Sequence, residues 1–140
     1  MKQNSLIRNT IATHLRDHIP DQPAPDGSGV WVKSVFPTFL IIDSVHETPA
    51  ILVHVNDGTR DDRYSDMPER YEGNLFVSVY LDGTASDDDI DDIGEAIKAL
   101  LPIGIRFPDV VTLSRSGFTY ERSPDNSYRA LHINHQYYWE

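Results

Sequence analysis

The sequence predicts an α+β fold, in which two main helices pack on a mixed or mainly antiparallel sheet of about four to six strands. The first observation is a two-residue alternation from Leu75 to Leu81, where every second side chain is aliphatic. The second is the stretch after it, residues 86–101, where isoleucine and leucine recur at helical spacing. The third is the length of 140 residues with 39% hydrophobic side chains, which favours one domain spanning residues 1–140.

A first helix is predicted from about residue 4 to residue 18, because aliphatic side chains recur there every three or four positions. Asn4 or Ser5 can cap it, and Pro20 ends the pattern. Residues 20–48 look like an insertion. They begin with a proline- and glycine-rich connection, and two short strand signals, residues 30–36 and 38–43, form either a hairpin or one strand broken at Pro37.

Residues 49–55 (PAILVHV) are predicted to form an interior strand that ends at the turn signal Asn56-Asp57-Gly58. Residues 59–69, which we call the arm, are polar and charged, and we expect them to protrude between two strands. The central strand should stop at Asp82, because Gly83 tolerates a positive φ.

Ser86 and Asp89 have the spacing of a capping box at the start of the second helix, and Pro102 ends that helix. Residues 103–113 are ambiguous between irregular structure and a short helical turn. A hairpin is predicted to close the chain, with one strand at residues 117–122, a turn at 123–126, and a terminal strand at 127–139. On that terminal strand one face should hold Leu131, Ile133, His135, Tyr137 and Trp139.

Composition narrows the function. The chain has no cysteine, which excludes disulfides and thiolate chemistry and favours the cytoplasm. Its net charge of −10 argues against binding to a phosphate backbone as the main activity, although an acidic surface can repel DNA that must slide past. No apolar run is long enough to span a bilayer.

The motifs predict no catalytic residue, no cofactor and no metal ligand. The acidic cluster at residues 87–92 fails the EF-hand template, and it is interpreted as helix capping rather than as a weak divalent site. His14 and His18 have helical spacing but lack the glutamate of the zinc-protease motif. His132 and His135 should point to opposite faces of one strand.

Two features indicate contact with another copy of the chain. The arm mixes both charge signs with an aromatic residue, so Arg60, Asp62, Arg63 and Tyr64 are the predicted subunit contacts, with a solvated loop as an equal alternative. Tyr138 lies on the opposite face of the last strand from Tyr137 and Trp139, where a neighbouring subunit would cover it.

The order of these parts resembles the tail terminator proteins of long-tailed bacteriophages, the lambda-type minor tail protein U family. The resemblance covers residues 1–20 and 48–140. It rests on the opening helix, the PAILVHV strand, the arm leading into NLFVSVYL, the acid-capped helix and the closing hairpin that begins GFTYER. Residues 20–48 depart from the family pattern because they are longer and richer in strand signals.

The resemblance implies a structural protein without enzymatic activity, located in the virion tail after assembly in the bacterial cytoplasm. It implies a hexameric ring that caps the tail tube, contacts the tail tube protein and the head–tail connector, and lets DNA pass without specific binding. The alternatives are a cytoplasmic small-molecule or metal-binding α+β module and, with no motif to support it, a carboxylate hydrolase.

Overall fold

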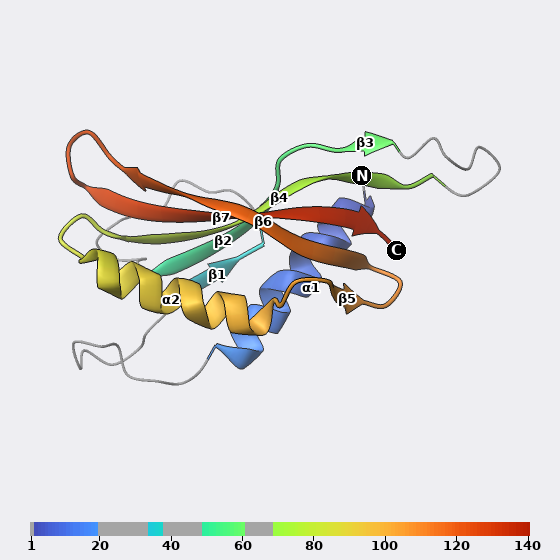
Figure 1. The fold of residues 1–140 in the computed structure, drawn as a ribbon, viewed down its shortest axis with the longest axis horizontal. Coiled ribbons are helices and arrows are strands. Elements are labelled where there is room, and N and C mark those ends of the chain that lie inside the picture. The colour runs from blue at the N-terminus through green and yellow to red at the C-terminus, as the bar shows by residue number, and fades with distance from the viewer. Residues whose placement is uncertain (1, 20–33, 38–48, 61–68) are drawn as a thin grey trace.

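The computed structural model describes residues 2–19, 34–37, 49–60 and 69–140 (Figure 1). Within them the chain forms an α+β fold of two helices and a seven-stranded mixed sheet, which confirms the predicted fold class. The elements are, in chain order, α1 (Lys2–His18), β1 (Ser34–Phe36), β2 (Ala50–Val55), β3 (Thr59–Arg60), β4 (Tyr71–Asp82), α2 (Asp87–Leu100), β5 (Ile105–Phe107), β6 (Val111–Arg122) and β7 (Tyr128–Trp139).

The sheet runs in the order β1-β2-β4-β7-β6-β5, and β3 pairs separately with the start of β4. Every pairing is antiparallel except that of β1 with β2. The three twelve-residue strands β4, β7 and β6 form the centre. Figure 1 shows β3 and the start of β4 at one end of the sheet and the β6–β7 connection at the other.

Both helices pack against one face of the sheet, and the core lies between them and that face. The alternation predicted for β4 is confirmed, since Leu75, Val77 and Val79 are fully buried in this core. The terminal strand follows its predicted pattern too, with Ile133 and Tyr137 buried on the helix side. Burial of aliphatic side chains from both layers supplies the main driving force for the fold.

The predicted start of α2 is confirmed in detail. Ser86 accepts a hydrogen bond from the backbone N–H of Asp89, and the Asp89 carboxylate accepts one from the backbone N–H of Ser86. Three aspartates occupy its first turn, where the helix dipole favours negative charge. In the described part of the chain, no helix is long and apolar enough to cross a membrane.

Two sequence-based expectations need correction, and a third is tested only in part. β4 does end at Asp82, but Gly83 does not have a positive φ; a Cβ there would lie 1.6 Å from the carbonyl oxygen of Asn126, so glycine is required by a close backbone approach. The ambiguous segment 103–113 holds β5 and the start of β6, joined by a turn in which Asp109 has a φ of 63°. Of the first strand signal, residues 34–36 form β1, while residues 30–33 and 38–43 lie outside the described residues.

Candidate functional site

The base of the arm is held firmly to the central strands. β3 pairs with the first two residues of β4, placing Thr59 opposite Glu72 and Arg60 opposite Tyr71. In the turn before β3, the carboxylate of Asp57 accepts a hydrogen bond of 2.8 Å from the backbone N–H of Asn74. The turn that the sequence predicts here is therefore fixed to β4 by a side-chain hydrogen bond.

Tyr137 of β7 fixes the same turn from the other side. Its hydroxyl donates a 2.7 Å hydrogen bond to the carbonyl oxygen of Asp57, and burial raises the pKa of this phenol. Two glycines allow the close approach. A Cβ on Gly58 would lie 2.5 Å from the Tyr137 hydroxyl, and a Cβ on Gly73 would lie 2.3 Å from the carbonyl oxygen of Asp57.

The structure brings two of the five predicted interface residues to one end of the sheet. Arg60 is exposed on β3, and Tyr138, which is 40% exposed, lies opposite Glu72 on the other side of β4. A groove of about 200 Å³ at this end is lined in part by Thr59, Glu72 and Tyr138, whereas Arg60 is not among its lining residues. The other three predicted contacts, Asp62, Arg63 and Tyr64, lie outside the described residues.

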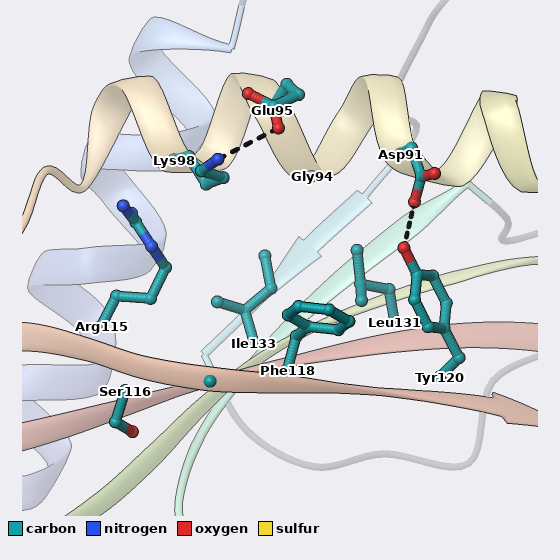
Figure 2. Close-up of a pocket in the computed structure, with 11 residues that line it drawn as sticks. Asp91, Gly94, Glu95, Lys98, Arg115, Ser116, Phe118, Tyr120, Leu131 and Ile133 are labelled. Atoms are coloured by element: carbon teal, nitrogen blue, oxygen red, sulfur yellow. Dashed lines mark hydrogen bonds and ion pairs between the residues drawn. The ribbon is translucent and has the colours of Figure 1, made fainter.

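A larger groove of about 530 Å³ separates α2 from β6, and sequence reasoning missed it (Figure 2). Leu131 and Ile133 of β7 lie at its floor, and Phe118 and Tyr120 project from β6 beside them. The hydroxyl of Tyr120 donates to the carboxylate of Asp91 on α2, which raises the pKa of this tyrosine to about 12. The sequence signal for this groove is the pair of large aromatic residues at alternate positions, 118 and 120, of one strand.

The sheet face opposite the helices carries a chain of polar side chains. Ser78 contacts the Nδ1 atom of His132 at 2.7 Å, and the Nε2 atom of His132 contacts the carboxylate of Glu121 at 2.7 Å. His54 lies 3.3 Å from the same serine oxygen, and burial, together with His132, lowers the pKa of His54. A nucleophile must reach its substrate, whereas Ser78 is fully buried, so this chain of contacts links β2, β4, β7 and β6 rather than presenting an acyl-transfer site.

The two histidine pairs and the acidic cluster do not form a metal centre in the described residues, where no group of three or more His, Asp or Glu side chains could hold an ion. His14 contacts the carbonyl oxygen of Leu100, and His18 contacts that of His14. His132 is on the open face of β7 and His135 is on the core face, as the strand spacing predicts.

Comparison with known proteins identifies the fold and the family of this chain. A solved chain described as "Virion of native gene transfer agent (GTA) particle" has the same fold, with a TM-score of 0.63, 12% identity, and coverage of 96% of this chain and 94% of that chain. The search of curated proteins gives no match. Residues 2–137 match the family of phage minor tail protein U. The chain therefore belongs to the phage minor tail protein U family, a family of structural components of phage tails.

Proposed function

We propose that this protein is a tail terminator: one domain of residues 1–140 that forms a hexameric ring on the finished tail tube. The ring stops addition of further tube subunits and offers a surface for joining the head. Its partners are then copies of itself, the tail tube protein and the head–tail connector. Its final place is the virion tail, after assembly in the bacterial cytoplasm, and the role requires no catalysis.

The observation that carries the proposal is the anchored base of the arm in a chain of this family. Bonds from β4 and β7 fix the root of the arm, so the exposed Arg60 leaves the sheet in a defined direction. Copies that contact one another through two different surfaces close into a ring when the rotation between them closes. The fixed root sets that rotation, and the exposed Tyr138, on β7 at the same end of the sheet, provides contact area for a neighbouring copy.

The charge of the chain fits a ring through which DNA passes. The net charge of −10 repels phosphates, and exposed acids such as Asp88 and Asp92 concentrate it on α2. We expect the lumen to be acidic, so that DNA passes without specific binding. Replacing these two acids with lysine should slow DNA ejection from assembled particles, and an unchanged ejection rate would remove this part of the proposal.

The proposal is tested with the purified protein and the tail tube protein expressed beside it. Light scattering after size exclusion should give a sixfold mass at high protein concentration, and substoichiometric amounts of the protein should halt tube growth. A strict monomer that leaves tube growth unchanged would contradict the proposal. A monomer whose melting temperature rises with an added metal ion would favour the small-molecule or metal-binding alternative.

A further inference from the structure

Among the described residues, the outer edge of β6 has no strand partner beyond Leu113. β5 pairs only with Val111–Leu113, and no other strand in the described ranges lies against that side of β6. From Ser116 to Arg122, therefore, backbone N–H and C=O groups face outward without a strand partner in those ranges. An exposed edge of this kind can accept an extended segment of another chain.

The groove between α2 and β6 lies directly beside this edge, so an added strand would point alternate side chains into it. Apolar surface is already present there: Phe118 is 67% exposed and lies against the opening, as Figure 2 shows. α2 lies close to the floor, because a Cβ on Gly94 would be 2.8 Å from a methyl group of Leu131. The groove is thus shallow under the middle of α2, with room for side chains rather than for a helix.

One end of the groove is cationic. Lys98 and Arg115 lie close together at that end (Figure 2). Lys98 pairs with Glu95, whereas the guanidinium of Arg115 donates to the carbonyl oxygen of Leu101 and has no carboxylate partner among the described residues. A segment that carries acids together with apolar or aromatic side chains would complement both the floor and this end.

We propose that the groove and the β6 edge receive the arm of a second copy of this chain. Residues 61–68 read DDRYSDMP, with three aspartates, one arginine, one tyrosine and one methionine. In an added strand Asp62, Tyr64 and Asp66 share one face, so Tyr64 matches the apolar floor and the aspartates beside it match Arg115. This inference rests on the proposed ring. It identifies the two different surfaces that meet at each contact between copies as the arm of one copy and the groove of the next. The root of the arm, on β3 and β4, and the groove between α2 and β6 are different surfaces of one copy, as a head-to-tail contact requires.

The first experiment separates the two surfaces with single substitutions. Tyr64→Ser alters the arm, Phe118→Ser alters the groove, and Ile103→Ser is the matched control, since Ile103 is 65% exposed and lies outside the groove. Circular dichroism first confirms that all three variants fold. The two test variants should each assemble at least tenfold more weakly than the unmodified chain, and the control should assemble normally.

Mixing the two test variants gives the sharpest result. The Phe118→Ser copy keeps an intact arm, and the Tyr64→Ser copy keeps an intact groove, so together they form one good contact and should give a one-to-one dimer. Under conditions where the unmodified chain assembles, a mixture that stays monomeric, or test variants that assemble as well as the control, would overturn the proposal.

A second experiment works even where the free chain is monomeric. Since the chain has no native cysteine, Tyr64→Cys with Phe118→Cys introduces one defined pair. Oxidation of assembled tails should link the double variant into a ladder ending at six copies, whereas each single variant should form no ladder. No ladder in normal tails, a link within one copy, or a link to the tube protein would overturn the groove assignment while leaving the ring itself in place. A ladder that continues past six copies would instead support the contact and contradict the hexameric ring.

Discussion

His135 gives the prediction that can be worked furthest. Its side chain is buried in the core face of β7, and neither ring nitrogen has a hydrogen-bond partner in the described structure. Burial, and then the charge of Arg115, lower the pKa of this imidazole from 6.5 to about 4. The folded chain therefore keeps His135 neutral at a pH where the unfolded chain protonates it.

The sign follows from proton linkage. Above pH 6.5 both states hold a neutral imidazole, and between 6.5 and about 4 the unfolded state binds the extra proton, so stability falls as the pH falls through that window. The loss attributable to this side chain is about 3 kcal/mol across the window. The substitution His135→Leu should abolish this pH-dependent loss. At pH 7.5 the variant should have an unchanged free energy of unfolding, or one about 1 kcal/mol higher, because two buried nitrogens without partners are removed.

The assay is urea unfolding of the unmodified chain and of His135→Leu at pH 7.5, 6, 5 and 4.5. The quantity compared is the difference in free energy of unfolding between the two proteins at each pH, which cancels the contributions of carboxylates that titrate in both. His18→Gln, at an exposed position, controls for loss of any imidazole. Equal pH slopes for the unmodified chain and His135→Leu would refute the reasoning.

The other predictions concern the elements that support the proposed contact. Gly73→Ala should destabilise the fold by about 1–3 kcal/mol, because its Cβ would meet the carbonyl oxygen of Asp57, and urea unfolding that shows no loss would contradict the described arm base. Ser86→Ala should cost about 1 kcal/mol through loss of the cap of α2, whereas Ser86→Asp, measured in the same way, should largely restore it. Trp139→Phe removes the hydrogen bond from the indole to Asn4 and should lower stability by about 1 kcal/mol, measured as a shift in the urea midpoint at constant m-value.

Regular spacing of apolar residues, with a period of two for a strand or about 3.6 for a helix, was enough to predict β4 and α2. The alternation of β4, the apolar spacing of α2 and its Ser86–Asp89 cap all depend on residues close in sequence, and each was confirmed. Family membership was also confirmed, since residues 2–137 match the family of phage minor tail protein U. The interface residues stay predictions.

What could not be predicted depends on contacts between distant residues. The need for glycine at position 83 comes from the backbone of Asn126, and the need at position 73 comes from Asp57, so neither is visible in its own neighbourhood. The same holds for the groove. The β6 edge beside it has no strand partner in the described ranges beyond Leu113, where β5 ends its pairing, and no local pattern in residues 103–113 fixes that length.

Direct imaging of tube ends tests the central claim. Tail tubes assembled with this protein should carry, at one tip only, a ring of six copies joined head to tail, with the arm of each copy seated on its neighbour. Tubes that grow to normal ends without the ring, or copies found along the tube wall instead of at its tip, would contradict the account.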